Sequence, residues 1–360
     1  MRVAVDGRAL RPGAVHERGV AGYLRWLLEA LGELAPDDEY VVIVPSLADP
    51  EPLRAANVRL LRRRVPSQLL FGAVPLLGRP RLDRLAAGCD VAWAPAPRPV
   101  AVSAEVNYVL TLHDLAFEHR PSDFSAYERA WHRLARPHRL AQAATRVICV
   151  SGPVRDEAVV RWRLDPEQTR VVAHGPGRPP GPAGALPAGL ADGFVLAVGA
   201  LEPRKRPELL IEGHRRARER GLAAALVFAG DGPLRGELER THATVLGHVG
   251  APLLESLYAN ALALACVSRE EGFGFTPVEA IARGTPAVVA DLPVFAETLG
   301  QGALRVAPGD ADALAEALLA LERSPDLRDR LVADGRAAAA RLSWEHAARE
   351  TRAVLAEAAR

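Results

Sequence analysis

Short apolar runs alternate with amphipathic stretches from one end of the chain to the other. Between the runs, apolar residues recur about every three or four positions, as on one face of a helix, for instance in Tyr23–Leu34, Glu208–Arg220 and Ala311–Leu321. This alternation predicts βαβ units and parallel sheets with helices on both faces. The predicted strands are Arg2–Val5, Tyr40–Val44, Val91–Trp93, Asn107–Leu112, Arg146–Val150, Arg170–Val172, Phe194–Val198, Ala225–Ala229, Thr244–Leu246, Ala261–Cys266, Ala287–Ala290 and Leu304–Val306.

One segment interrupts the alternation near the middle of the chain. Residues 175–189 consist mostly of Gly and Pro, which disfavour helix interiors and central strands, so the segment is predicted to link two domains. Ser343 is a suitable N-cap for a last helix. The predicted division is an N-terminal α/β domain over 1–175, a linker over 176–189, a C-terminal α/β domain over 190–342 and the helix 343–360.

Composition narrows the class of protein. The net charge of +1 argues against a dedicated nucleic-acid binder, which is usually strongly basic. Cys89, Cys149 and Cys266 are an odd set within or beside apolar runs, which favours buried thiols in a reducing, cytoplasmic compartment. The chain starts directly with a predicted strand and has no long apolar run, so we expect neither a signal peptide nor a membrane span. Its richness in Ala, Arg, Pro and Gly is typical of a high-GC bacterial genome.

Residues 268–279 read Ser-Arg-Glu-Glu-Gly-Phe-Gly-Phe-Thr-Pro-Val-Glu. They place Glu271 and Glu279 on either side of a Gly-aromatic turn that opens a predicted helix. Carboxylates accept hydrogen bonds from sugar hydroxyls, and a helix N-terminus attracts an anion. A nucleotide sugar, with hydroxyls at both ends and a diphosphate between them, fits this combination. The structural alternative is an exposed loop residue followed by a helix-surface residue.

Lysine use is the second chemical signal. Lys205 is the only lysine among 45 basic residues, and it lies in Gly-Ala-Leu-Glu-Pro-Arg-Lys-Arg, residues 199–206, just after a predicted strand. A compact ammonium is a natural partner for a phosphate oxygen. A solvated loop charge is the alternative interpretation.

Taken together, these motifs resemble those of the retaining GT-B glycosyltransferases of family 4, which include bacterial mannosyltransferases and glycogen-synthase-like enzymes. The resemblance covers almost the whole chain and depends on the order and spacing of the motifs. They are Asp6-Gly7-Arg8, Thr111-Leu112-His113-Asp114-Leu115, Val150-Ser151, Gly199–Arg206, Ala229-Gly230-Asp231-Gly232-Pro233, Leu246-Gly247-His248-Val249 and Glu271–Pro286.

The resemblance implies a GT-B architecture: two Rossmann-like, doubly wound parallel-sheet domains facing a cleft, with residues 343–360 packing back on the first domain. It implies retaining transfer of a hexose to a glycan or lipid-linked acceptor in cell-envelope or polysaccharide synthesis. The Leu-Glu-Pro-Arg-Lys variant resembles the mannosyltransferase branch, which favours mannose from GDP-mannose. Other donors left open are UDP- and ADP-sugars. A UDP-N-acetylglucosamine 2-epimerase and a degenerate nucleotide-binding scaffold also remain alternatives.

The resemblance also implies roles at the donor. Glu279 would bind the ribose hydroxyls and Glu271 a sugar hydroxyl. Lys205, with Arg204, would neutralise the diphosphate leaving group, where negative charge develops as the anomeric bond breaks. His113 would lie beside the donor sugar, although a histidine after an apolar run also fits a structural role.

Further donor contacts are implied for backbone groups. The backbone of Phe273, Gly274 and Phe275 would lie near the sugar and diphosphate, and that around Val249 would meet the base. Gly19 would bring a glycine-rich loop to the donor.

Some positions weaken individual assignments. Ser151 would join the donor site, but it also fits a helix cap. Many relatives carry arginine where Ala200 stands, and Ala21 adds a methyl where backbone would approach a phosphate. These departures are the grounds for the scaffold alternative.

Two acidic residues look like a metal site and are explained otherwise. Asp310 and Asp312 form an Asp-x-Asp pattern after Pro308-Gly309, at the start of an amphipathic helix. Asp310 as N-cap and Asp312 in the first turn account for them. With no His/Cys cluster at metal spacing, we expect metal-independent activity.

A basic segment followed by an apolar one suggests a membrane contact. Residues 59–64 read Arg-Leu-Leu-Arg-Arg-Arg, and residues 68–77 are mainly apolar. The pair could face anionic lipid heads at the inner membrane surface. The alternative is a solvated basic turn before a core helix.

Overall fold

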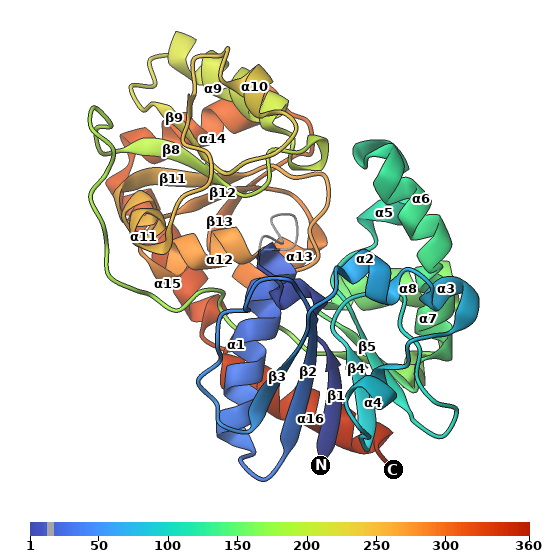
Figure 1. The fold of residues 1–360 in the computed structure, drawn as a ribbon. Helices are drawn as coiled ribbons and strands as arrows, with labels where there is room; N and C mark the ends of the chain where they lie inside the picture. The colour runs from blue at the N-terminus through green and yellow to red at the C-terminus, as the bar shows by residue number, and fades with distance from the viewer. Residues whose placement is uncertain (13–17) are drawn as a thin grey trace. The chain divides into compact units, whose positions relative to one another are not determined.

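The computed structural model describes residues 1–12 and 18–360, and the chain divides into two compact units (Figure 1). The N-terminal unit comprises Met1–Gly175 and Leu342–Arg360, and the C-terminal unit comprises Pro176–Arg341. Each unit is a parallel sheet with helices, and each is described separately below.

The N-terminal unit contains a seven-stranded parallel sheet of order β3-β2-β1-β4-β5-β6-β7. The order reverses direction beside β1, as in doubly wound folds, where ligands bind beyond the carboxyl ends of the strands. The strands are β1 (Arg2–Asp6), β2 (Glu39–Pro45), β3 (Val58–Arg63), β4 (Val91–Ala94), β5 (Tyr108–Leu112), β6 (Arg146–Cys149) and β7 (Thr169–Val171).

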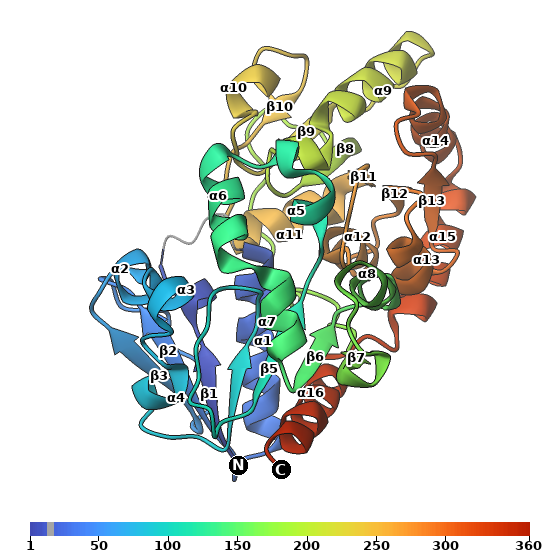
Figure 2. The same ribbon diagram turned by 90° about the vertical axis from the view of Figure 1, so that its right-hand side faces the viewer.

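Helices connect these strands. The longest is α1 (Arg18–Leu34), and α16 (Trp344–Ala358) returns from the end of the chain to pack against it (Figure 2). The others are α2 (Ser67–Phe71), α3 (Val74–Leu77), α4 (Leu82–Leu85), α5 (Ala116–His119), α6 (Ala126–Ala135), α7 (Pro137–Ala143) and α8 (Gly152–Trp162), with the 3-10 turns η1 (Arg8–Leu10), η3 (Pro121–Asp123) and η4 (Pro166–Gln168).

The C-terminal unit has a six-stranded parallel sheet of order β10-β9-β8-β11-β12-β13. Its direction reverses between β8 and β11, so the loops after these two strands leave the same edge side by side. The strands are β8 (Phe194–Val198), β9 (Leu226–Ala229), β10 (Thr244–Val245), β11 (Ala261–Cys266), β12 (Ala287–Ala290) and β13 (Ala303–Val306). The helices are η5 (Pro203–Lys205), α9 (Pro207–Glu219), α10 (Arg235–Leu238), α11 (Ala251–Asn260), α12 (Phe275–Ala282), α13 (Pro293–Leu299), α14 (Ala311–Arg323) and α15 (Pro325–Ala339).

Alternate residues of the central strands face opposite helix layers in this unit. Val195 and Phe228 pack in one buried cluster with α9 and α14, while Leu196 and Val227 pack in another with α11 and α12 (Figure 2). Both faces of the sheet are therefore covered, which explains why its strands read as near-continuous apolar runs.

The predicted parallel α/β sheets are confirmed, with two corrections. β3 was not predicted, because Val58–Arg63 carries arginines at three of its six positions and reads as a basic turn. It is the outer strand of the sheet, where such residues can reach solvent. Residues 18–22 were expected to form a glycine-rich loop, but they are the first turns of α1. Within the described residues, no helix combines the length and apolarity needed to cross a bilayer.

Candidate nucleotide-sugar site

The Gly-aromatic turn joins β11 to α12. Gly274 is the residue before α12 and has φ of 83°, in the left-handed region that glycine adopts most easily. A Cβ at this position would lie 2.5 Å from Cε1 of Phe295. Both constraints require glycine, and together they fix where α12 begins and where its first N–H groups point.

Glu271 lies in the loop before this turn and is bound from two sides. Its Oε1 accepts hydrogen bonds from Lys205 Nζ at 2.5 Å and from Ser268 Oγ at 2.8 Å. Burial alone would raise the pKa of this carboxyl, but the charges of Lys205 and Arg204 outweigh it and hold the pKa below its usual value. Glu271 is therefore an ionised carboxylate beside a cation.

Glu279 lies inside α12 and has different partners. Its Oε1 accepts from the backbone N–H of Arg178 at 2.7 Å, and its Oε2 accepts from the Tyr258 hydroxyl at 2.9 Å. Burial raises the pKa of Glu279 above its usual value, although both hydrogen bonds act in the opposite direction. A carboxylate has further lone pairs, so these bonds do not exhaust its capacity to accept.

The segment after the unit boundary runs directly against Glu279. Gly177 has φ of 84°, and a Cβ there would lie 2.5 Å from Cγ of Glu279. Residues 177 and 178 lie within the stretch predicted as linker. In the structure they contribute contacts to the C-terminal unit and hold one carboxylate oxygen in place.

Lys205 and Arg204 lie in the short turn η5, which follows β8. Because β8 and β11 are parallel neighbours, η5 and the Glu271 loop leave the same sheet edge, and Arg269 N–H donates to the Arg204 carbonyl at 2.9 Å. Arg204 Nε also donates to Glu202 at 3.0 Å. Arg204 and Lys205 thus lie close to Glu271, as predicted cations beside a predicted carboxylate. The side chains of the two cations are about one quarter exposed.

The backbone positions predicted around the donor lie at the same edge of the C-terminal unit. Phe273 is buried and Phe275 is half-buried, with ring centroids 5.2 Å apart. Val249 lies half-buried in the loop between β10 and α11, packed against the cluster that contains Tyr258. Their contacts with a donor stay predictions.

His113 follows β5 in the N-terminal unit, at the carboxyl edge of that sheet. Its Nε2 lies 2.7 Å from the carbonyl of Pro95, which can only accept, so Nε2 carries the proton. Burial lowers the pKa of His113, and the Tyr23 ring meets it edge-on at 4.8 Å. The neutral ring presents Nδ1 as an acceptor. The structure therefore makes His113 suitable for accepting a bond from a sugar hydroxyl and unsuitable as a cation.

Two other predicted contacts have structural explanations. Ser151 is fully buried and its hydroxyl accepts from Val154 N–H at the start of α8, which is the capping role. Gly19 lies in the first turn of α1, and a Cβ there would meet no atom within 4 Å. Their roles as donor contacts stay predictions.

The early Asp6-Gly7-Arg8 motif forms a buried ion pair. Arg8 Nη2 lies 2.6 Å from Asp6 Oδ2, and both side chains are 3% exposed. Arg8 also lies over the Phe71 ring and donates to the Pro99 carbonyl. The pair fixes the loop after β1.

The Asp-x-Asp pattern behaves as the helix start that was predicted. Asp310 caps α14 by accepting from Ala313 N–H at 2.9 Å, and Asp312 pairs with Arg216 on α9 and with Arg220 just after it. Over the described parts of the chain, no three His, Cys, Asp or Glu side chains form a group that could hold a metal ion.

Sequence reasoning missed several partners of the predicted residues. Tyr258 and the Arg178 backbone bind Glu279, Ser268 binds Glu271, and His174 lies 5.5 Å from His113 between ring centroids. Ser268 could have been found, since it lies only three positions before Glu271 in the same loop. The other contacts come from elements that are distant in the sequence, so no local spacing predicts them.

Two family models match successive parts of the chain. Residues 18–175 match "Glycosyltransferase Family 4", and residues 186–338 match "Glycosyl transferases group 1".

Curated relatives show the same similarity at modest identity. The O-antigen chain mannosyltransferase RfbU of Salmonella typhimurium is 27% identical over 62% of this chain and 63% of its own length. The D-inositol 3-phosphate glycosyltransferase of Frankia alni is 30% identical over 60% of each chain. The chain thus spans less than two thirds of the length of these relatives.

Among solved structures, the fold is similar to that of a sucrose-phosphate synthase from Thermosynechococcus elongatus. The TM-score is 0.75 at 20% identity, over 99% of this chain and 98% of the other. At this identity the likeness establishes the fold alone, and that fold agrees with the two-sheet architecture described above.

Proposed function

We propose that this chain catalyses retaining transfer of a hexose from a nucleotide sugar to a glycan or lipid-linked acceptor. The chain belongs to the glycosyltransferases of family 4 and has their GT-B fold. The observation that carries the proposal is the Lys205–Glu271 pair at the edge shared by β8 and β11, beside the N-terminus of α12. It combines a cation and the positive end of a helix dipole for a diphosphate with a carboxylate for a sugar hydroxyl.

The reaction follows from this chemistry. The bond between the anomeric carbon and the diphosphate oxygen breaks, and its electron pair leaves with the nucleoside diphosphate. The acceptor hydroxyl oxygen forms the new bond on the same face of the sugar, and its proton goes to the departing diphosphate oxygen. Lys205 and Arg204 stabilise the charge that develops on the leaving group, and Glu271 holds a sugar hydroxyl while His113 accepts from another.

We propose GDP-mannose as the donor and cell-envelope or polysaccharide synthesis as the context. The support is the Leu-Glu-Pro-Arg-Lys sequence at 201–205 and the mannosyltransferase relative at 27% identity. Glu279 grips the ribose, and the backbone around Val249 meets the base.

A thermal-shift screen of the full chain against GDP-, UDP- and ADP-sugars tests the donor, because a ligand that binds the native state raises its apparent stability. We expect the largest shift with GDP-mannose. A larger shift with a UDP- or ADP-sugar would identify that sugar nucleotide as the donor in place of GDP-mannose. Conversion of the sugar nucleotide without acceptor would favour an epimerase, and binding without any turnover would favour a scaffold.

We also propose that turnover needs no divalent metal. Asp310 already serves as a helix cap, and Asp312 already pairs with Arg216 and Arg220. Rates in excess EDTA should equal rates with added magnesium or manganese, and a strict requirement for either ion would contradict this.

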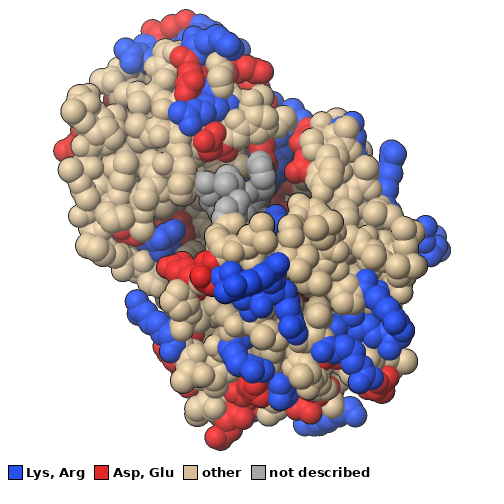
Figure 3. All heavy atoms as spheres, viewed as in Figure 1, with Lys and Arg blue, Asp and Glu red and all other residues tan. Residues whose placement is uncertain are grey.

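Peripheral contact with an anionic lipid surface is a further part of the proposal. Leu69, Leu76 and Leu77 on α2 and α3 are 72–79% exposed, and Figure 3 shows basic side chains gathered over β3 and its surroundings. Arginines beside exposed leucines suit an interfacial contact. The chain should sediment with vesicles that contain phosphatidylglycerol, and Leu76→Gln/Leu77→Gln should reduce this; equal sedimentation of both proteins would remove the proposal.

A further inference from the structure

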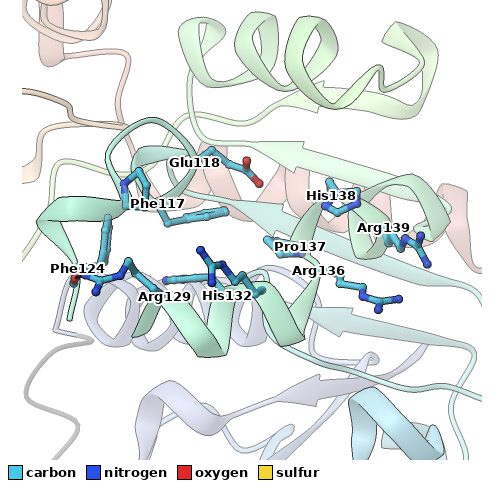
Figure 4. Close-up of a pocket in the computed structure, with 11 residues that line it drawn as sticks. Phe117, Glu118, Phe124, Arg129, His132, Arg136, Pro137, His138 and Arg139 are labelled. Atoms are coloured by element: carbon cyan, nitrogen blue, oxygen red, sulfur yellow. Dashed lines mark hydrogen bonds between the residues drawn. The ribbon is translucent and has the colours of Figure 1, made fainter. Parts of the chain in front are cut away.

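A pocket of about 540 Å³ lies among α5, α6 and α7 of the N-terminal unit (Figure 4). Figure 4 shows Phe117 and His132 facing each other at its centre, Phe124 and Arg129 at one end, and Arg139 at the other. The volume is in the range of small-ligand sites. The pocket is formed entirely by residues 117–139, and none of the predicted donor residues lines it.

Stacked rings form a rigid wall in this pocket. The rings of Phe117 and His132 are 4.6 Å apart between centroids and only 8° from parallel, and Phe124 meets His132 edge-on at 5.6 Å. Burial lowers the pKa of His132, against the raising effect of nearby carboxylates. The wall is thus neutral and apolar, with a ring nitrogen able to hydrogen-bond.

Arginines supply the charge around that wall. Arg129, Arg133 and Arg136 follow one another at spacings of four and three, so they lie on one face of α6 and its end, and Arg139 lines the pocket from α7. Arg129 donates to the Phe124 carbonyl at 2.5 Å. Across residues 1–12 and 18–360, none of the four guanidinium groups has an ion-pair partner. Like charges one turn apart destabilise a helix, so this arrangement costs free energy unless an anion offsets it.

Arginines on other helices of this chain are placed differently. Arg215 pairs with Glu212 and Glu219, Arg235 pairs with Glu239, and Arg349 pairs with Glu345, each about one turn away. These three arginines are neutralised within their helices, whereas Arg218 on α9 and Arg330 on α15 have no ion-pair partner among the described residues. The pocket differs in bringing four such arginines together, and Glu118 is the acidic residue among those that line it.

The backbone at Arg136 adopts a conformation that Ala87, Arg163 and Arg206 also adopt in this chain. It has φ of 45°, in the left-handed region, and it joins α6 directly to Pro137 at the start of α7. A residue with a Cβ costs about 1 kcal/mol in this conformation, and glycine or asparagine is the common choice at a helix end. The same junction recurs where Arg206 precedes Pro207 at the start of α9, so the conformation sets the direction of α7 and does not by itself mark a binding site.

We propose that this pocket binds a phosphate or diphosphate group carried by the acceptor. Four guanidinium groups without a carboxylate partner provide planar donors for phosphate oxygens, and Phe117 and His132 provide a surface for the adjoining apolar or sugar moiety. Phe117 follows His113 by four positions, so the pocket adjoins the loop assigned to the transferred sugar. That the anion belongs to the acceptor rests on the proposed function, whereas the binding of an anion in this pocket does not. Glu118 accepts from an acceptor hydroxyl beside the anion.

The test measures anion binding apart from turnover. Inorganic pyrophosphate is titrated calorimetrically into the Lys205→Ala chain, which lacks the principal donor-side cation, and into the same chain carrying Arg133→Gln/Arg136→Gln. We expect the pocket substitutions to weaken binding roughly tenfold or more, as loss of two charge-assisted contacts implies. Raising the salt concentration should weaken the binding that remains in the parent.

A matched control removes the same charge elsewhere. Arg240 and Arg330 are exposed, without ion-pair partners in the described chain, and lie in the C-terminal unit. Arg240→Gln/Arg330→Gln should leave pyrophosphate affinity unchanged. Arg133→Gln alone, on an exposed position, gives a second variant whose fold is not in question, and it should show an intermediate loss. Thermal unfolding of every variant checks that the fold persists.

Two arms separate the sources of the anion. Phosphatidylcholine vesicles with undecaprenyl diphosphate present it on a lipid, and pyrophosphate presents it free. Pocket-dependent retention on the vesicles assigns a lipid-borne acceptor, and pocket-dependent binding of pyrophosphate without such retention assigns a soluble one. Equal pyrophosphate affinity in pocket and control variants, or no binding to the Lys205→Ala chain, overturns the proposal. If no nucleotide binds the wild-type chain while pyrophosphate binding still depends on the pocket, the proposed function fails and the anion site stands.

Discussion

At the residue scale, the pKa values of Glu271 and Glu279 are shifted in opposite directions although the two residues are only eight positions apart. Lys205 and Arg204 hold the pKa of Glu271 below its usual value, while burial raises that of Glu279. A carboxyl with a lowered folded pKa adds stability above its usual value of 4.5, and that stability is lost as the pH falls through the folded pKa. A carboxyl whose pKa is raised in the folded state, such as Glu279, adds stability at low pH. That stability is lost as the pH rises through the folded pKa.

The two Gln variants should therefore differ in the sign of their effect on stability. At pH 7, Glu271→Gln leaves Lys205 without its carboxylate partner and should lower the free energy of unfolding by about 1–3 kcal/mol. Glu279→Gln should be neutral or stabilising, because the amide can accept from Arg178 N–H and donate to Tyr258 while no buried charge remains. Urea unfolding at pH 7 and pH 4 measures both, and the difference between wild type and Glu271→Gln should shrink at pH 4.

The same pair should separate in ligand binding. Ribose is a part of the donor that does not react, so Glu279→Gln should weaken nucleoside diphosphate and donor alike. Glu271→Gln should keep nucleoside diphosphate affinity and lose turnover, since the sugar is where charge develops. Equal losses of nucleotide affinity in the two variants would contradict this division of roles.

Lys205 offers a prediction on the leaving group. Its removal should reduce turnover by about two powers of ten or more, as for loss of a preorganised electrostatic group. Lys205→Arg should restore it only in part, because a planar fork does not replace a compact ammonium held against Glu271. Steady-state rates at saturating donor measure the effect, and near-normal turnover in Lys205→Ala would withdraw the assignment.

At the element scale, strands with unbroken apolar runs were predicted from the sequence. The strand β3, whose apolar run is interrupted by arginines, was not. β11 and β12 are buried on both faces and read directly from their Ala, Val and Leu residues. β3 has arginine at three of its six positions, with no regular alternation, and lies at the sheet edge, so its pairing with β2 decides its conformation and its own composition does not. Likewise, Lys205 and Glu271 were each predicted from local motifs. Their contact arises from the pairing of β8 with β11, which no local spacing encodes.

The start of α12 gives the prediction at this scale. Gly274→Ala places a methyl in the left-handed region and against Phe295, so it should cost about 1–3 kcal/mol and displace the first N–H groups of the helix. Nucleoside diphosphate affinity should fall with it. Gly236→Ala in α10 is the control, since a Cβ there meets nothing within 4 Å, and it should be tolerated. Calorimetric binding and urea unfolding of both variants check this; unchanged binding in Gly274→Ala would show that α12 does not hold the diphosphate.

At the scale of the whole molecule, the C-terminal unit is inserted between two pieces of the N-terminal unit. The chain leaves the first unit at Gly175 and rejoins it at Leu342. α16 then completes that unit: Arg352 Nε donates to the buried Asp38 at 2.8 Å, and Asn107 donates to the Ala358 carbonyl. Trp344 packs within 5.4 Å of Trp26 between ring centroids. The last helix thus belongs to the core of the first unit although it follows the second in sequence.

Removing α16 should therefore unfold one unit and spare the other. A chain ending at Arg341 exposes the apolar face of α1 and leaves Asp38, 3% exposed, without Arg352. Hydrogen exchange followed by mass spectrometry should show protection lost through residues 18–175 and kept through 190–341, where Glu279, Lys205 and Glu271 retain their partners. Arg352→Ala, which removes only the ion pair, should raise exchange near Asp38 and leave α12 unchanged. Because Glu279, Lys205 and the backbone around Val249 lie in the spared unit, the truncated chain should still bind nucleoside diphosphate while transferring no sugar. Loss of protection in both units together would mean that the inserted unit depends on the first for its stability.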